Sequence, residues 1–256
     1  MAEEESTKRG AAVYDIDILV PVFNEKEVIV ATLEEIARKV LTAHRIYIVY
    51  DFDEDNTLPV VAGYIASRKM DHIVLLKNDY GRGVVNAIKK GFDASEASAA
   101  LVVMGDLSDE LGVVDLMAAK IRGGFDIVCG SRYMKGGRQI GGPWFKGFLS
   151  RMAGLSLHFL TGIPTHDISN SFKMYARHVL KSIEIESTGG FELGMELVVK
   201  AFLRGWKITE IPATWRDRSA GQSRFRLWAW LPHYLRWYFL AFRKKNHSGP
   251  ASLKLS

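Results

Sequence analysis

The sequence predicts an α/β protein in which a mostly parallel sheet carries helices on both faces. Short apolar runs that suit buried strands alternate with longer stretches whose apolar residues recur at helical spacing. Of the 256 residues, 48% are hydrophobic and 25% are charged, which is typical of a globular protein with a large core. No apolar run of about 18 residues occurs, so we expect no transmembrane helix.

Strands and helices alternate regularly through the first half of the chain. Apolar runs predict strands at 15–23, 45–50, 73–76, 99–104 and 126–129. The stretches between them predict helices at 27–41, 58–69, 84–92 and 112–122. Beyond residue 131 the pattern is less regular, with helices expected near 148–160 and 191–203 and a strand at 207–211. The last element, 225–242, reads as an aromatic-rich helix that Pro232 starts or bends.

These elements divide the chain into one large domain and three short segments. We expect a loose polar tail at 1–14, an α/β domain at 15–224, an amphipathic helix at 225–245 and a second tail at 246–256. Aromatic and aliphatic residues flanked by arginine and lysine indicate that this helix lies in a membrane interface. A helix packed on the domain or on a second subunit fits the same pattern, so both interpretations stay open.

Acidic residues follow three of the predicted strands at the points where the strands end. The first strand is followed by Glu25, the second by acids at 51–55 and the fourth by acids at 106–110. Because the carboxyl ends of parallel strands share one edge of such a sheet, we expect these carboxylates to converge on one cleft. Gathered carboxylates repel one another unless a cation neutralises them. Mg²⁺ and Mn²⁺ prefer oxygen ligands and also bind diphosphates, so Asp106 is the leading candidate for a metal ligand.

A series of short motifs, taken in order, resembles one known enzyme family. The motifs lie at 21–25, 51–57, 78–83, Asp106, 130–133, 167–173 and 217–224. Over roughly residues 17–226 the chain resembles the inverting glycosyltransferases of family 2, which have the GT-A nucleotide-sugar fold. The resemblance is strongest to the branch of dolichyl- or polyprenyl-phosphate mannosyltransferases. It implies a Rossmann-like mixed sheet flanked by helices, followed here by the aromatic amphipathic helix.

The resemblance also implies roles for individual residues. The donor nucleotide would contact Pro21, Phe23, Glu25, Asp51, Asp55, Gly81, Arg82 and Asp106. The metal would be held by Asp106, with Asp109 as a second candidate. The acceptor phosphate would contact the guanidinium groups of Arg132, Arg138, Arg218 and Arg224. The residues expected to act in catalysis are Asp106, Arg132 and Arg218.

The implied reaction moves a hexose from a GDP- or UDP-linked donor to a polyprenyl phosphate, with inversion at the anomeric carbon. The leaving diphosphate gains negative charge, which Mg²⁺ or Mn²⁺ and cations such as Arg82 would stabilise. A lipid phosphate is already ionised near neutral pH and needs no general base, whereas a sugar hydroxyl needs one. Glu192 and Glu196, one helical turn apart, either orient the acceptor or form ion pairs.

The partners expected are a nucleotide-sugar donor and an anionic lipid or glycolipid acceptor, and an oligomer is compatible with the sequence. We expect the protein in the cytoplasm, peripheral at the inner face of the cytoplasmic membrane. The single cysteine, Cys129, fits a reducing compartment. Nucleic-acid binding is not expected, because the basic residues follow acidic strand ends and form no recognition helix or stacking platform.

Two departures from the family pattern keep alternatives open. Met104 stands where the family usually has the first carboxylate of its metal motif, and 51–53 reads Asp-Phe-Asp instead of Asp-Gly-Ser. Asp109 or Glu110 could replace the missing carboxylate, or one carboxylate with water could suffice. One alternative function is transfer to a hydroxyl of a glycan or glycolipid. The other is a nucleotide-sugar-binding protein with weak turnover.

Overall fold

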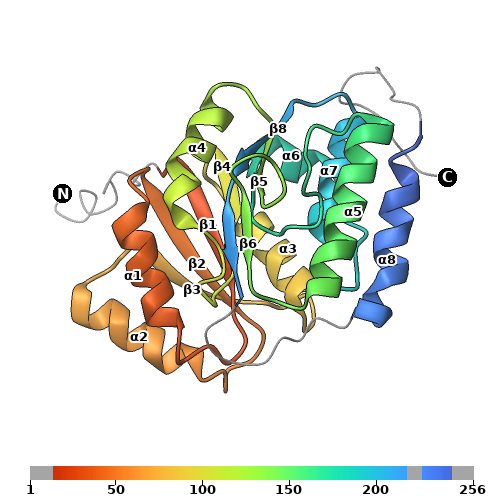
Figure 1. Cartoon of the computed structure of the whole chain (residues 1–256). Coiled ribbons are helices and arrows are strands. Elements are labelled where there is room, and N and C mark those ends of the chain that lie inside the picture. Colours follow the sequence, from red (N-terminus) through yellow and green to blue (C-terminus); the bar gives the residue numbers. More distant parts are fainter. Residues whose placement is uncertain (1–13, 218–226, 244–256) are drawn as a thin grey trace.

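The computed structural model describes residues 14–217 and 227–243, and a seven-stranded sheet lies at its centre (Figure 1). The strand order is β3-β2-β1-β4-β7-β5-β8, and β6 and β9 form a separate two-stranded sheet. The strands are β1 (Ile16–Pro21), β2 (His44–Tyr50), β3 (Ile73–Lys77), β4 (Ala99–Val102), β5 (Ile127–Ser131), β6 (Arg138–Ile140), β7 (Lys173–Ala176), β8 (Ile208–Pro212) and β9 (Thr214–Arg216). The helices are α1 (Ile29–Lys39), α2 (Thr57–Arg68), α3 (Val84–Ala94), the 3-10 turn η1 (Leu111–Val113), α4 (Val114–Arg122), α5 (Trp144–Thr161), α6 (Arg177–Ser182), α7 (Leu193–Leu203) and α8 (Leu227–Leu240).

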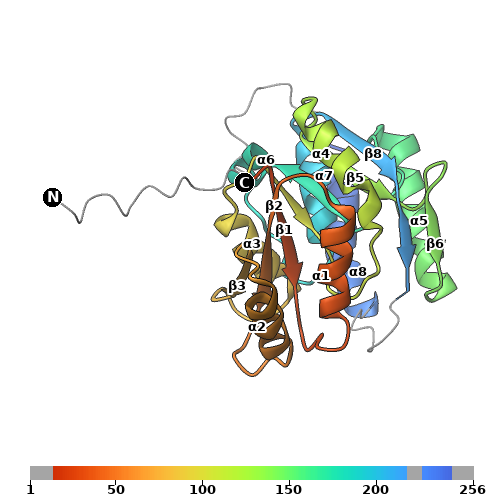
Figure 2. The same ribbon diagram turned by 90° about the vertical axis from the view of Figure 1, so that its left-hand side faces the viewer.

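Alternating side chains of β1 connect the sheet to two layers of helices. Ile18 and Val20 pack in a core with residues of α1, α2 and α4, whereas Leu19 packs in a core with residues of α3 and α7. This division follows from strand geometry, because successive side chains point to opposite faces of a sheet. Figure 2 shows α1 and α3 on opposite sides of β1. The prediction of helices on both faces is therefore confirmed.

The half of the sheet made of β3, β2, β1 and β4 is parallel, as predicted. Its register pairs Pro21, the last residue of β1, with Val49 of β2, and Leu19 with Val102, the last residue of β4. The loops that follow β1, β2 and β4 therefore leave the sheet at the same edge. The three acidic segments noted in the sequence lie on these loops.

The other half of the sheet is mixed, because β7 runs antiparallel between β4 and β5. The sequence pattern alone did not predict β7, and one of its four residues is the fully buried Lys173. A lysine interrupts the apolar run by which buried strands are recognised. β6 and β9 also escaped prediction, since they have only three residues each. The resulting mixed sheet agrees with the fold that the family resemblance implies.

The last described helix, α8, lies beside α5 and packs on α7 (Figure 1). Pro232 lies inside α8 and does not start it, since the helix begins at Leu227. Trp237 is 1% exposed and joins the core that contains α7. Within residues 14–217 and 227–243, no helix combines the length and the apolar character needed to cross a bilayer. The tails predicted at 1–14 and 246–256 lie almost wholly outside the described residues.

Candidate active site

The loop after β1 is fastened to the loop after β2. Asn24 has a left-handed φ of 57°, and its backbone N–H donates to both carboxylate oxygens of Asp55 at 3.1 Å. Asp55 also accepts a bond from Thr57 N–H (2.8 Å), and the Thr57 hydroxyl accepts one from Glu25 N–H (2.9 Å). Asp55 is only 1% exposed, so its carboxylate shapes the loop that carries Phe23 and Glu25.

Asp51 in turn holds the glycine loop that follows β3. Its two carboxylate oxygens accept hydrogen bonds from Asn78 Nδ2 (2.7 Å) and from Gly83 N–H (2.9 Å). Asn78 Nδ2 also donates to the Gly81 carbonyl (2.7 Å). The φ angles of Gly81 and Gly83 are 97° and 123°, which only glycine adopts without strain. The loop therefore has a fixed shape next to Asp51.

Three side chains from three loops stack at this place. The rings of Phe23 and Phe52 meet edge to face with their centroids 5.2 Å apart, and the Arg82 guanidinium lies 5.2 Å from the Phe52 centroid. The sequence motifs had selected Phe23 and Arg82 but not Phe52, the residue that joins them. Phe52 could have been selected from the sequence by its position, because it directly follows Asp51 at the end of β2.

Asp106 lies in a tightly held loop after β4. Its side chain is 6% exposed, and Oδ1 accepts a hydrogen bond from Ser108 N–H (3.1 Å). Leu107 between them has a φ of 60°, which is uncommon for a residue with a side chain. The Thr32 hydroxyl of α1 donates to the carbonyl just before Asp106 (3.0 Å), and Arg216 N–H of β9 donates to the Ser108 carbonyl (2.9 Å). Such strain persists only where surrounding contacts impose it, and it is concentrated at functional sites.

Glu25 connects the loops after β1 and β2 to the Asp106 loop. A Cβ atom built on Gly105 would lie 3.8 Å from Glu25 Cγ and 3.6 Å from Val22 Cγ1. The Glu25 side chain therefore lies beside the residue that precedes Asp106. Together with the contacts among the loops after β1, β2 and β3, this places Asp51 and Asp106 at one edge of the sheet.

Asp109 brings a carboxylate next to Met104, the position at which this chain lacks the usual carboxylate of the family motif. Its Oδ2 accepts a hydrogen bond from Met104 N–H at 3.1 Å. Glu110 accepts its bond from Thr214 N–H (2.7 Å), which directs it toward β9. Of the two acids considered as replacements, Asp109 is the one whose carboxylate is hydrogen-bonded to the backbone of Met104.

Burial raises the pKa of Asp109 from 3.8 to about 7. The hydrogen bond from Met104 N–H opposes this shift, the neighbouring Asp106 carboxylate increases it, and the charges of Arg132 and Lys173 oppose it. Asp106 and Asp109 therefore lie close enough for their charges to interact. A cation between them would favour the ionised form of both.

We expect Asp109→Asn to flatten the pH dependence of stability. The folded protein keeps this proton up to about pH 7, whereas the unfolded chain releases it near the ordinary value of 3.8. Between these values the unfolded state binds fewer protons, so the free energy of unfolding falls as pH rises, by at most about 1.4 kcal/mol per pH unit. Urea unfolding of both proteins at pH 5 and pH 7, with a chelator present, measures the difference. An equal change in the two proteins would contradict it.

Arg132 and Asp167 form a buried ion pair at the end of β5. Nε and Nη2 of Arg132 donate to the two carboxylate oxygens at 2.7 and 2.9 Å, and the backbone N–H donates at 3.0 Å. Nη2 also reaches the hydroxyls of Ser150 on α5 (3.0 Å) and of Ser169 (3.2 Å). Only 12% of the Arg132 side chain and none of Asp167 is exposed. The guanidinium therefore joins β5 to α5 and to the loop before β7.

The other arginines expected at the acceptor phosphate are placed differently or not described. Arg138 is exposed on β6. Arg218 and Arg224 lie outside the described residues. The structure thus brings together the residues predicted to bind the donor. Of the arginines predicted to bind the acceptor phosphate, it describes Arg132 in its ion pair and Arg138 on the surface.

The buried side chain of Lys173 supports the loop that carries Asp167. The sequence analysis did not predict this role. The Lys173 Nζ donates to the carbonyls of Ile168 and Asn170. Asn170 Nδ2 donates to the Gly130 carbonyl (2.9 Å), so the loop is also tied to β5. The only available signal was a lysine directly after an aromatic residue inside a family motif.

The two glutamates near the start of α7 differ in their environments. Both are fully buried, and Glu196 accepts from Lys200 Nζ (2.6 Å) and from the backbone N–H groups of 186 and 187 (2.7 and 2.8 Å). Glu196 therefore has the ion-pair role. Glu192 Oε1 accepts from Gly189 N–H (2.7 Å), but its Oε2 has no hydrogen-bond partner in the part of the chain that the structure describes.

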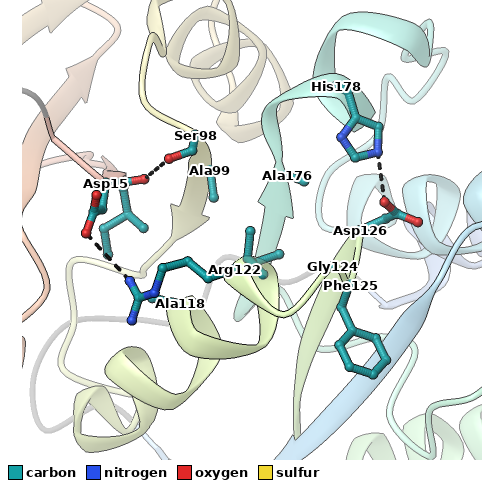
Figure 3. A pocket seen from close by; sticks show the side chains of 12 residues that line it. Asp15, Ser98, Ala99, Ala118, Arg122, Gly124, Phe125, Asp126, Ala176 and His178 are labelled. Carbon is teal, nitrogen blue, oxygen red and sulfur yellow. Dashed lines mark hydrogen bonds and ion pairs between the residues drawn. The ribbon is translucent and has the colours of Figure 1, made fainter.

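The hollows in the described surface include one beside the Asp106 loop and one at the opposite edge of the sheet. One of about 540 Å³ lies between α1, the Asp106 loop and β9, and its lining includes Ser108, Asp109 and Arg216. The other, of about 270 Å³, is shown in Figure 3 with the ion pair of His178 and Asp126 (2.9 Å) at its rim. Its lining includes Ile16 and Ala99, the first residues of β1 and β4, so it opens at the sheet edge opposite to Asp106.

Comparison with known proteins identifies the family. Residues 17–184 match the profile described as Glycosyl transferase family 2. The chain belongs to this family. It is therefore a glycosyltransferase, and its architecture is the GT-A fold of the family, as the resemblance implied.

Individual relatives of this glycosyltransferase agree with that placement. The polyprenol monophosphomannose synthase of Mycolicibacterium smegmatis is 27% identical over 212 residues, which are 81% of this chain and 79% of that protein. The dolichol-phosphate mannosyltransferase of Pyrococcus furiosus is 26% identical over 220 residues, and the match spans 82% of this chain but 59% of that protein. The family 2 chain thus resembles the polyprenyl-phosphate mannosyltransferase branch.

A solved structure of low sequence identity shows the same fold. The glucosyl-3-phosphoglycerate synthase of Mycobacterium tuberculosis, in complex with Mn²⁺, UDP-glucose and phosphoglyceric acid, superimposes with a TM-score of 0.67 at 15% identity. The match covers 89% of this glycosyltransferase and 79% of that chain.

Proposed function

We propose that this glycosyltransferase moves a hexose, with mannose as the first candidate, from a nucleotide sugar to a polyprenyl phosphate. The observation that carries the proposal is the placement of the buried Asp106 carboxylate at the same sheet edge as the loops of Glu25, Asp51 and Arg82. The choice of sugar and acceptor is supported by the names of the two relatives, a polyprenol monophosphomannose synthase and a dolichol-phosphate mannosyltransferase.

On the donor side, the loops after β1, β2 and β3 would bind the nucleotide. Phe23 and Phe52 supply aromatic surface for a base, and Asp51 supplies a carboxylate that can accept from it. Arg82, exposed on the glycine loop, would contact the diphosphate. Pro21, Asp55 and Gly81 would fix the shape of these loops. Residues 51–53 read Asp-Phe-Asp where the family usually has Asp-Gly-Ser, so a comparison of GDP- and UDP-linked donors must identify the nucleotide.

The carboxylates of Asp106 and Asp109 fit a divalent cation. Carboxylate oxygen is the donor that Mg²⁺ and Mn²⁺ prefer, and Mg²⁺ commonly needs only one or two protein carboxylates beside substrate phosphates and water. Burial and the charge of Asp106 raise the pKa of Asp109 despite the opposing charges of Arg132 and Lys173, so a cation bound beside it would favour its ionised form. A bound cation would stabilise the negative charge that develops on the leaving diphosphate.

On the acceptor side, the geometry of Arg132 supports a positioning role. Its guanidinium is directed at Asp167, so it would hold α5 and the 165–170 loop in place and not bind the phosphate directly. The exposed Arg138, and Arg218 and Arg224 in the segment not described, remain the candidates for direct phosphate contacts. An ionised phosphate can attack the anomeric carbon without a general base, from the face opposite to the leaving group.

The experiment is a labelled-donor assay with GDP-mannose, UDP-glucose and other nucleotide sugars, with and without Mn²⁺. We expect label to enter a phospholipid that mild acid cleaves. Label in an acid-stable saccharide would instead support transfer to a hydroxyl. A candidate base for that alternative is the buried Glu192, whose Oε2 has no hydrogen-bond partner among the described residues. Donor binding in calorimetry without metal-dependent turnover would support a binding protein.

A further inference from the structure

Phe52 stands at a position where this chain departs from the family pattern. Residues 51–53 read Asp-Phe-Asp, whereas the family usually has Asp-Gly-Ser, so the usual residue at position 52 has no side chain. Phe52 directly follows Asp51 at the end of β2, and β2 lies between β1 and β3 in the sheet. Its ring therefore adds a surface, between the loops after β1 and β3, that a glycine would not provide.

The Phe52 ring contacts one side chain from each of these two loops. Phe23, from the loop after β1, meets it edge to face, with 5.2 Å between the centroids and 65° between the ring planes. The Arg82 guanidinium, from the loop after β3, lies over the ring at 5.2 Å from its centroid. A cation within about 6 Å of an aromatic centroid is attracted to the electron-rich face of the ring. Phe52 thus holds the Arg82 guanidinium beside Phe23.

Arg82 has a fixed backbone, but its long, exposed side chain still has to be oriented. The glycines on either side of it are held by hydrogen bonds of 2.7 and 2.9 Å, which fix the loop. Within residues 14–217 and 227–243, the Arg82 guanidinium forms no ion pair, and it lies over the Phe52 ring. A side chain that is already held in place loses less conformational entropy when a ligand binds to it. The ring therefore prepares the guanidinium for an anion without neutralising its charge.

We propose that Phe52 is a positioning residue for donor binding and that it acts through Arg82. Its ring holds the guanidinium where the diphosphate of the nucleotide sugar binds; this role of Arg82 rests on the proposed function. Loss of the aromatic face should therefore weaken binding of the diphosphate and leave binding of the nucleoside almost unchanged. A residue that only stacked on the base would weaken both alike.

The test compares nucleoside diphosphates with nucleosides as ligands of the full chain, in the presence of Mn²⁺. UDP and GDP are titrated by calorimetry, and uridine and guanosine by ligand-observed NMR. The variant is Phe52→Leu, which keeps an apolar side chain but has no aromatic face. The Kd of the diphosphate that binds the wild type more tightly should rise about fivefold in the variant, whereas the Kd of its nucleoside should change less than about twofold. Phe52→Tyr keeps the aromatic face and should restore the wild-type Kd.

A double-mutant cycle with Arg82→Ala tests whether Phe52 acts through this arginine. In the Arg82→Ala background, Phe52→Leu should have no further effect on the Kd of the diphosphate. The matched control is Tyr80→Leu, which removes a ring from the same glycine loop that has Lys90 Nζ 5.2 Å from its centroid. Lys90 is already paired with Asp79 at 2.8 Å, so the control should leave the Kd within about twofold.

Kinetics and melting distinguish positioning from a loss of structure. With saturating donor, kcat of Phe52→Leu should stay within about twofold, so that the change appears in KM. Thermal melting by circular dichroism checks that the variant is folded, and Phe52→Met, which also lacks an aromatic face, takes its place if leucine unfolds the protein.

An unchanged Kd of the diphosphate in Phe52→Leu would overturn this inference and leave the proposed function standing. Equal weakening of diphosphate and nucleoside, or an undiminished effect in the Arg82→Ala background, would also overturn it, because Phe52 would then act without Arg82. A wild type that binds neither UDP nor GDP would overturn the proposed function together with this inference.

Discussion

Asp106→Ala is expected to lower donor turnover at least about 100-fold, because it removes the buried carboxylate nearest to the expected diphosphate. The effect should be large since Met104 supplies no second carboxylate in the motif. Asp109 alone would then have to hold the cation, so Mg²⁺ or Mn²⁺ would lose one of its two candidate protein carboxylates. Turnover of labelled nucleotide sugar and Mn²⁺ binding by calorimetry should therefore fall together.

The matched control for this change is Asp53→Ala. Asp53 also follows a central strand, but it is 66% exposed and pairs with Lys77 on the surface at 2.5 Å. Its loss should leave turnover within about twofold, as expected for an exposed ion pair. If Asp106→Ala kept wild-type turnover while still folded, the assignment of the metal and of the whole donor site would be wrong.

The parallel half of the fold was predictable because its strands are continuous apolar runs. β1, β2 and β4 are buried between two helix layers, so most of their residues are apolar on both faces of the sheet. The sequence therefore showed a clear alternation of apolar strands and amphipathic helices. β7 could not be predicted in this way, because it contains a lysine. Lys173 can be buried there because its Nζ donates hydrogen bonds to the carbonyls of residues 168 and 170. Those bonds exist only in the folded chain.

The site was predictable to the extent that loop position determines it. The convergence of the acids after β1, β2 and β4 was expected from strand position. Phe23 and Arg82 were expected beside Asp51 from the family resemblance, and their loops do meet in the structure. The partner of a side chain was less predictable. Arg132 and Asp167 were each picked out by a motif, but their 35-residue separation hid that they bind each other. A guanidinium suited to phosphate is equally suited to a carboxylate, and the sequence does not distinguish the two.

Asp167→Ala is expected to be the most destabilising of these changes, at about 3–5 kcal/mol, because it leaves the buried charge of Arg132 without its partner. Burial alone would raise the pKa of Asp167, but the charge of Arg132 and its hydrogen bonds outweigh burial and lower the pKa below the ordinary 3.8. The ion pair therefore stabilises the protein above that pH and loses its effect as pH falls through the lowered pKa. Urea unfolding at pH 7 measures the loss.

A double-mutant cycle separates this pair from the packing around it. Asp167→Leu with Arg132→Met removes both charges, so it should cost clearly less than the sum of the single changes. The exposed pair of Glu34 and Arg68, with side chains 49% and 52% exposed at 2.7 Å, serves as the comparison and should cost at most about 1 kcal/mol. If Asp167→Ala were as mild as Glu34→Ala, the guanidinium would have water or another acceptor available. Arg132 would then be free to bind the acceptor phosphate directly, and its positioning role would have to be withdrawn.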